Sequence, residues 1–292
     1  MQGAGLASVD RRHRRSVTAV VPALNEAANI GWVLGRLPEC VDEVVVVDGR
    51  STDDTIEAAL RARPDARVVC EMRPGKGAAL RAGFERASGD YVVMLDADGS
   101  MEPAEITSYL SVLEEGYDLV KGSRFITGGG STDISRVRVI GNLGLLQLIN
   151  RLHGCSFTEL CYGYMAFRRS VLPRLRLTAD GFEIEAQIVS HSLRAGLRVA
   201  EVASFEAMRR SGESNLRTFR DGSRVVRELI RARMRRFPAL GSENATASTS
   251  TSGATGQPPA GGPGRVVSAP LRTDPVSAIS RSPEPQPSVC SK

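Results

Sequence analysis

Short runs of β-branched residues alternate with helical patterns in the first part of the chain, and this alternation constrains the fold more than any other feature. The runs lie at residues 17–21, 44–47, 67–70 and 91–95. Apolar residues recur at helical spacing over residues 27–37 and 78–87, between these runs. Strands that alternate with crossover helices form a mostly parallel sheet. The sequence therefore predicts an α/β fold with a Rossmann-like sheet flanked by helices.

The fourth run ends at two acids one residue apart, Asp96 and Asp98, followed by Gly99 and Ser100. The carboxyl end of a strand is where open α/β sheets bind ligands. Because side chains alternate along a strand, the two carboxylates can share a side and hold Mg²⁺ or Mn²⁺ together with substrate phosphates. The same residues are also typical of a strand that ends in a turn. Taken alone, they leave both interpretations open.

Polar residues also follow the first two runs, with Asn25 and Glu26 after the first and Asp48 after the second. The carboxyl ends of parallel strands lie at one edge of the sheet, so we expect these side chains to meet Asp96 and Asp98 in a single crevice. The first strand lacks the Gly-x-Gly-x-x-Gly that a dinucleotide site requires. This excludes a dehydrogenase of that type.

Two further patterns concern the turns before helices. Lys76 lies between two glycines, without the spacing of a phosphate-binding P-loop, so it either reaches an anion or lies in a surface turn. Ser51 and Asp54 have the Ser-x-x-acid spacing of a capping box, which predicts the start of the second helix there.

The two ends of the chain differ in composition from its centre. Residues 1–15 are basic and residues 238–292 are rich in Ser, Thr, Pro and Gly. We therefore expect both segments to be disordered, on either side of one domain at 16–237.

The net charge of +5 and the arginines near 217–236 suit an anionic partner. No secretory signal and no membrane span is recognised, which predicts a cytoplasmic protein.

The five cysteines include no Cys-x-x-Cys pair, and the chain has three histidines. Structural zinc and a histidine-rich metal site are therefore not expected, and the thiols are expected to be reduced. Aromatic residues make up 5% of the chain and no DNA- or RNA-binding motif is recognised, so a nucleic-acid partner is not expected.

Taken together, the motifs of this chain resemble those of family 2 glycosyltransferases with the GT-A fold. The resemblance extends to about Arg236 and is carried by Val20-Val21-Pro22-Ala23-Leu24-Asn25-Glu26, Val47-Asp48-Gly49-Arg50-Ser51-Thr52-Asp53, Gly75-Lys76-Gly77 and Leu95-Asp96-Ala97-Asp98-Gly99. Later motifs are most similar to polyprenyl-phosphate and dolichyl-phosphate hexose synthases and their bacterial relatives. The chain departs from those relatives at Gly49, Glu159, Tyr162 and Asn215, mostly in acceptor-side motifs.

The resemblance implies a role for each matching residue. The nucleoside pocket would be lined by Pro22, Asn25, Glu26 and Asp48. The metal on the diphosphate would be held by Asp96 and Asp98, with Ser100 as a further oxygen ligand. The phosphates would be faced by Lys76 and Arg124, and by Arg136 or Arg138 in the following loop.

The implied reaction is metal-dependent transfer of a hexose from a UDP-, GDP- or dTDP-sugar, with inversion. A hydroxyl acceptor needs a general base, for which Glu183 and Glu185 are the candidates. A lipid phosphate is already an anion near neutral pH and needs no strong base; Arg209 or Arg210 could then clamp it. Polyprenyl phosphate is the expected acceptor.

Three alternatives stay open: the same donor chemistry on a soluble metabolite or antibiotic scaffold, a sugar nucleotidyltransferase, and a sugar-nucleotide-binding protein without turnover. Residues 216–237 form a basic amphipathic pattern. Such a helix either lies on the inner face of an anionic membrane or packs on the domain with its arginines exposed.

Overall fold

The computed structural model describes residues 14–212, 218–234 and 267–269. The strands are β1 (Val17–Ala23), β2 (Glu43–Asp48), β3 (Arg67–Cys70), β4 (Tyr91–Met94), β5 (Leu119–Ser123), β6 (Gly130–Ser131), β7 (Met165–Arg168), β8 (Val199–Ala203), β9 (Phe205–Glu206) and β10 (Val267–Ala269). The helices are α1 (Ile30–Gly35), α2 (Thr55–Ala62), α3 (Lys76–Arg86), α4 (Ile106–Glu114), α5 (Arg136–His153), α6 (Leu172–Leu175), α7 (Ile184–Arg194) and α8 (Thr218–Met234), with 3₁₀ turns at Pro103–Glu105 and Arg169–Val171.

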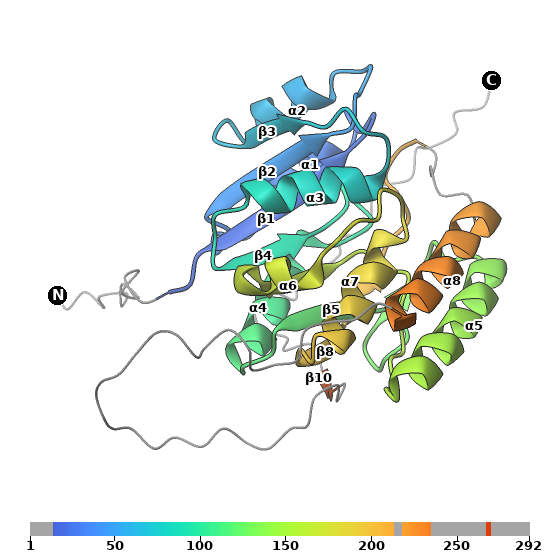
Figure 1. Ribbon diagram of the computed structural model, residues 1–292. Helices are drawn as coiled ribbons and strands as arrows, with labels where there is room; N and C mark the ends of the chain where they lie inside the picture. The colour runs from blue at the N-terminus through green and yellow to red at the C-terminus, as the bar shows by residue number, and fades with distance from the viewer. Residues whose placement is uncertain (1–13, 213–217, 235–266, 270–292) are drawn as a thin grey trace, which may run out of the picture.

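The centre of the molecule is an eight-stranded sheet in the order β10-β8-β5-β7-β4-β1-β2-β3 (Figure 1). Its strands pair in parallel, apart from β7, which runs antiparallel to both β4 and β5. Strands β6 and β9 form a small second sheet. The mostly parallel α/β fold expected from the sequence is confirmed.

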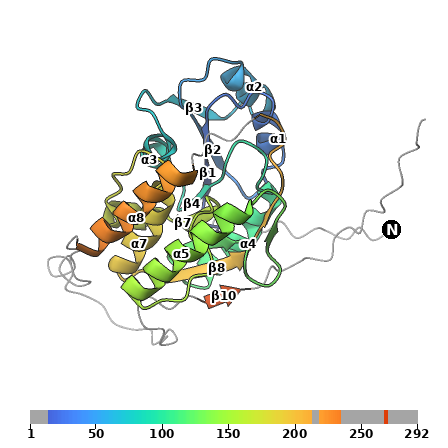
Figure 2. The ribbon, with the colours of Figure 1, turned by 90° about the vertical axis from the view of Figure 1, so that its right-hand side faces the viewer.

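Helices cover both faces of the large sheet, with α3, α5, α7 and α8 on one side and α1, α2 and α4 on the other (Figure 2). The alternation of side chains along β1 produces the two layers. Val17 and Val21 are buried in the same apolar cluster as Ile30 of α1, whereas Val20 belongs to the cluster that contains Leu80 of α3. A strand that is apolar on both faces is typical of such a buried sheet.

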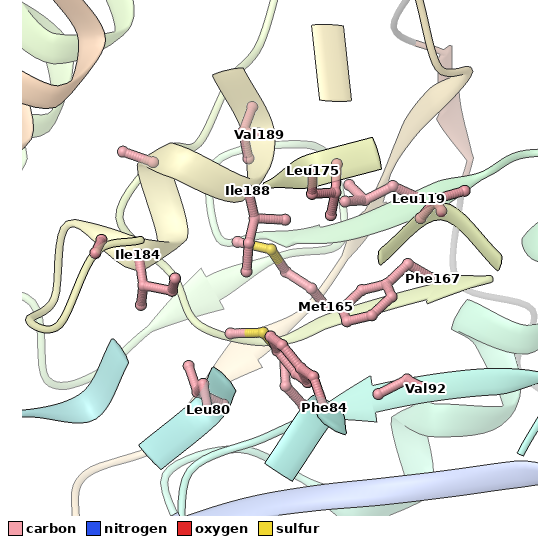
Figure 3. Close-up of a cluster of buried hydrophobic side chains, with 14 of the residues drawn as sticks. Leu80, Phe84, Val92, Leu119, Met165, Phe167, Leu175, Ile184, Ile188 and Val189 are labelled. Carbon is pink, nitrogen blue, oxygen red and sulfur yellow. The ribbon is translucent and has the colours of Figure 1, made fainter. Parts of the chain in front are cut away.

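The apolar cluster under α3 and α7 fixes the positions of these two helices (Figure 3). Phe84 of α3 meets Phe167 of β7 edge to face, with ring centroids 5.2 Å apart. Ile188 of α7 and Met165 of β7 lie beside them and are fully buried. Burying a side chain of this size contributes about 1.5–3 kcal/mol. Both helices begin at the same edge of the sheet, where the polar residues gather.

The predicted capping box is wrong. Helix α2 begins at Thr55, and the side chain of its N-cap residue, Asp54, makes no capping hydrogen bond. The hydroxyl of Ser51 instead accepts the backbone N–H of Asn25 at 2.9 Å. The side chain of Ser51 therefore connects the loops after β1 and β2, and the helix starts later than the pattern indicated.

The expected disordered ends, 1–15 and 238–292, fall almost entirely outside the described residues and stay predictions. Within the second range, Val267–Ala269 forms β10 and pairs in parallel with β8 at the edge of the sheet.

Among the described helices, none combines the length and the apolar character needed to cross a bilayer. The described cysteines are free thiols, as expected: Cys40, Cys70, Cys155 and Cys161.

Helix α3 lies so close to the sheet that Gly83 has no room for a side chain. A Cβ there would lie 2.4 Å from Val20 Cγ1 and 2.9 Å from Val47 Cγ2. We expect Gly83→Ala to lower the free energy of unfolding by about 1–3 kcal/mol, because overpacking moves the helix from the sheet. Gly144→Ala is the control: it lies on α5 with nothing within 4 Å, and should be neutral or stabilising by up to about 1 kcal/mol. Equal denaturation midpoints for the two variants would contradict the close contact.

His153 in the last turn of α5 gives the domain a pH dependence. Burial, with repulsion from Arg194 and Arg233, lowers the pKa of His153 from 6.5 to about 4. The unfolded chain takes up this proton near pH 6.5 and the folded chain only near pH 4, so protonation favours unfolding within that window. We expect the melting temperature to fall between pH 6.5 and 4, and to fall less in His153→Gln. Parallel pH profiles for the two proteins would contradict this assignment.

Candidate active site

A cavity of about 340 Å³ lies at the carboxyl ends of β1 and β4, beside the first residue of α3. Residues of α5, α7 and α8 complete its wall. Most of the residues expected to bind substrate or metal line it: Pro22, Glu26, Lys76, Asp96, Asp98, Ser100, Arg124, Arg138, Glu185 and Arg209. The convergence of strand ends predicted from the sequence therefore places these residues around one space.

The acid pair sits in the turn that follows β4. Gly99 has a φ of 76°, a left-handed conformation that glycine adopts without steric cost, and it turns the chain after Asp98. The backbone N–H of Ser100 donates to Asp98 Oδ1 at 3.0 Å. Burial raises the pKa of Asp96 to about 6, and the nearby Lys76 ammonium opposes this rise. The turn thus presents two carboxylates to the cavity.

Lys76 connects the acid pair to α7. Its Nζ lies 2.6 Å from Asp96 Oδ1 and 2.8 Å from Glu185 Oε1. Burial alone would lower the pKa of Lys76, but the Asp96 and Glu185 carboxylates raise it above its ordinary value. Lys76 therefore stays an ammonium ion, paired with two carboxylates of the chain itself. That it faces a donor phosphate stays a prediction.

Two glycines allow this contact. A Cβ at Gly75 would lie 2.1 Å from the carbonyl oxygen of Asp180, and one at Gly77 would lie 2.4 Å from that of Ala179. The backbone N–H of Ala78 donates to the Asp180 carbonyl at 3.1 Å. The glycines flanking Lys76 let the segment before α7 approach closely enough for Glu185 to reach the ammonium.

Arg209 forms the second cationic contact of the acid pair. One terminal nitrogen lies 3.2 Å from Asp98 Oδ2, and the other contacts Glu26 Oε1. Glu26 also accepts a hydrogen bond of 2.6 Å from Asn29. Burial raises the pKa of Glu26, against the lowering effects of Asn29 and Arg209. The carboxylates expected to bind donor and metal are thus joined to a residue expected to bind acceptor phosphate.

Arg124 lines the cavity, but its guanidinium is bound within the protein. Nε lies 2.7 Å from Glu159 and Nη1 lies 2.8 Å from Glu206, while Nη2 donates to the Cys161 carbonyl at 3.2 Å. The side chain is 2% exposed. All three guanidinium nitrogens of Arg124 thus contact acceptors of the protein, which joins Glu159, Glu206 and Cys161 in the cavity wall.

The remaining candidates lie outside the cavity. Asp48 accepts the N–H groups of the turn after β2, and Asn25 accepts the N–H of Thr52. The Glu183 carboxylate accepts the N–H of Gly181, before α7. Arg136 is exposed at the start of α5. Arg210 stacks over the ring of Trp32, 4.7 Å from its centroid. The roles implied for Asn25, Asp48, Arg136, Glu183 and Arg210 therefore gain no support from the cavity itself.

Glu206 and Asn142 are among the cavity residues that were not recognised from the sequence. Glu206 of β9 receives Arg124 and the hydroxyl of Ser131. Asn142 of α5 is buried, and its Oδ1 accepts the N–H groups of Leu160 and Cys161 at 3.4 Å each. An Asn among the apolar residues of a helix is a usable sequence signal, because a buried amide needs partners. No local pattern marks Glu206.

Asp96 and Asp98 are the side chains that could hold a divalent cation. Within residues 14–212 and 218–234, no group of three or more His, Cys, Asp and Glu side chains is arranged to bind a metal. A magnesium-type ion bound by two carboxylates completes its shell with water and substrate phosphates. The donor set therefore fits Mg²⁺ or Mn²⁺ bound together with a nucleoside diphosphate.

Known proteins share this architecture. The family model "Glycosyl transferase family 2" matches residues 18–176. Glycosyltransferase AglJ of Haloferax volcanii is 37% identical over 225 residues, covering 74% of this chain and 71% of AglJ. Polyprenol monophosphomannose synthase of Mycolicibacterium smegmatis is 31% identical over 229 residues, covering 74% of this chain and 86% of the synthase.

A solved structure resembles the chain over a similar length. It is glucosyl-3-phosphoglycerate synthase from Mycobacterium tuberculosis, in complex with Mn²⁺, UDP and glucosyl-3-phosphoglycerate. The match has a TM-score of 0.61 and 29% sequence identity, covering 78% of this chain and 82% of the synthase. The resemblance inferred from the motifs is confirmed: the chain belongs to glycosyl transferase family 2 and is a glycosyltransferase with the GT-A fold.

Proposed function

We propose that the chain transfers a hexose from a nucleoside diphosphate sugar to a polyprenyl phosphate, inverting the anomeric centre. The composition of the cavity carries this proposal. Its wall includes the Asp96 and Asp98 carboxylates, and also apolar side chains of two neighbouring helices, Leu145 of α5 and Val225 of α8. A metal-bound diphosphate and the first units of a lipid require these two kinds of surface in one site.

On the donor side, Asp96 and Asp98 would hold Mg²⁺ or Mn²⁺ on the diphosphate, with Ser100 as a further oxygen beside them. The cation would neutralise charge on the departing diphosphate. Lys76 keeps Asp96 in place from the other side. The Mn²⁺ and UDP in the glucosyl-3-phosphoglycerate synthase complex support a nucleoside diphosphate donor. UDP-, GDP- and dTDP-hexoses are the candidates.

On the acceptor side, the pairing of the cavity carboxylates favours a phosphate over a hydroxyl. Glu185, the expected base within the cavity, is bound to the ammonium of Lys76. The ammonium therefore occupies one oxygen of the carboxylate that a hydroxyl acceptor would need as its base. A phosphate oxygen needs no base: it would bond to the anomeric carbon as the bond from that carbon to the diphosphate breaks. Arg138 lines the cavity and is suited to hold such an anion.

The surface next to the cavity supports a lipid acceptor as well. Val137, Ile140 and Leu143 of α5 are exposed, as are Ile230 and Met234 of the neighbouring α8. Exposed arginines lie on α8 among these apolar residues: Arg220, Arg227, Arg231 and Arg233. Apolar side chains flanked by cations suit an anionic bilayer. We propose that α5 and α8 bring the cavity to a membrane surface.

A soluble acceptor is the second candidate. Glucosyl-3-phosphoglycerate synthase is also solved in complex with UDP-glucose and phosphoglyceric acid, an anionic acceptor that bears a hydroxyl group. Such an acceptor would use the same donor site without the apolar wall. The assay below distinguishes the two candidates.

We expect the purified chain to release NDP from one of these sugar nucleotides when Mn²⁺ or Mg²⁺ and a short polyprenyl phosphate are present. Asp98→Ala should lower the rate by roughly a hundredfold or more, because a metal ligand is lost. Asp65→Asn, which changes an exposed acid outside the cavity, is the control.

NDP release with phosphoglyceric acid but not with lipid would show that the acceptor is a soluble molecule and not polyprenyl phosphate. Pyrophosphate formed from sugar phosphate and NTP would indicate a nucleotidyltransferase instead, whereas nucleotide-sugar binding without turnover would leave a binding protein.

The membrane surface has its own test. We expect the chain to co-sediment with vesicles that contain phosphatidylglycerol more than with pure phosphatidylcholine, and added salt should weaken this binding. Ile140→Glu should reduce it, since a buried charge opposes insertion. Leu60→Glu on α2 introduces the same charge at an exposed leucine of the opposite helical layer. Equal losses in both variants would contradict a membrane face formed by α5 and α8.

A further inference from the structure

The guanidinium of Arg209 lies against Asp98, one of the two carboxylates that would hold a divalent cation. It bridges Asp98 and Glu26, two carboxylates of different loops, and its Nε donates to the Ser211 carbonyl at 2.9 Å. The Arg209 side chain is 17% exposed. Its contacts within the cavity are thus with the acids that face the donor.

Each oxygen of Asp98 already has a partner in this arrangement. Oδ1 accepts the N–H of Ser100 at 3.0 Å, and Oδ2 faces Arg209 at 3.2 Å. A divalent ion bound to Oδ2 would lie within a few ångströms of the guanidinium. At that separation two positive charges repel strongly in a partly buried site. The cation and Arg209 therefore compete for the same carboxylate.

Lys76 is the other cation beside the acid pair and, like Arg209, it has a second carboxylate partner. Its ammonium pairs with Glu185 as well as Asp96 and belongs to the first turn of α3. When Asp96 binds a cation, Lys76 retains Glu185 as its counter-charge. Once it leaves Asp98, the guanidinium of Arg209 can bind a phosphate group, because its planar fork matches the phosphate oxygens.

Resting on the function proposed above, we propose that Arg209 is an exchangeable counter-ion of the metal site. It holds Asp98 and Glu26 until a divalent cation arrives with a nucleoside diphosphate, and it then moves from Asp98 to a phosphate oxygen. Donor and cation bind cooperatively, since the diphosphate provides the partner that Arg209 needs on leaving Asp98.

The test is calorimetric titration of MnCl₂ into the full chain, without and with UDP. Arg209→Gln removes the competing charge, so we expect Mn²⁺ alone to bind roughly five- to tenfold tighter than to the unmodified chain. The factor by which UDP strengthens Mn²⁺ binding should be smaller in Arg209→Gln, because no released guanidinium gains a phosphate. Arg209→Lys keeps the charge, so its affinity for Mn²⁺ should stay close to that of the unmodified chain. This variant tests the role of the charge even if Arg209→Gln folds poorly.

Arg210→Gln is the matched control. It removes the same charge from the next residue, whose guanidinium lies over Trp32 and not on the acids, and should leave Mn²⁺ affinity unchanged. Unchanged or weaker binding of Mn²⁺ in Arg209→Gln overturns the counter-ion exchange while leaving the proposed function intact. Mn²⁺ binding that survives Asp98→Asn, or is absent from every variant, overturns the metal site on which both proposals depend.

Discussion

The buried ammonium of Lys76 is the interaction on which the geometry of the site depends. It draws Asp96 of the β4 turn and Glu185 of α7 to one point, although Glu185 lies 109 residues away in sequence. A buried charge without partners would cost several kcal/mol, so the two carboxylates and the ammonium hold each other in place. The contact requires Gly75 and Gly77, because any side chain there would collide with the backbone before α7.

The direction of β7 explains why the acceptor-side loop shares the cavity with the donor-side acids. β7 runs antiparallel to β4, with Met165 opposite Met94, so the residues before β7 lie beside the carboxyl end of β4. Cys161, Tyr162 and Gly163 consequently line the same cavity as the acid pair. A strand parallel to β4 would have placed this loop at the other edge of the sheet.

Sequence patterns identified the strand ends well and the direction of individual side chains poorly. Asp96 and Asp98 lie in the cavity as expected, because a turn directly after a buried strand leaves little choice. Asp48 also follows a buried strand, yet its carboxylate accepts the N–H groups of its own turn. Neighbouring residues can likewise differ: Arg209 lines the cavity, while Arg210 stacks on Trp32. In a loop, where side chains do not alternate regularly, local spacing carries no information on which of two adjacent side chains faces a cavity.

The sequence by itself determined the α/β class, the strand positions, the family and the acid pair, because β-branched runs, helical periodicity and turn residues act over short distances. Only the tertiary structure decided which charges pair. It assigned Lys76 to Asp96 and Glu185, Arg124 to Glu159 and Glu206, and Arg209 to Asp98 and Glu26. These partners come from loops and helices far apart in the chain. Their pairing depends on burial and on the close approach of backbones, which no local pattern specifies.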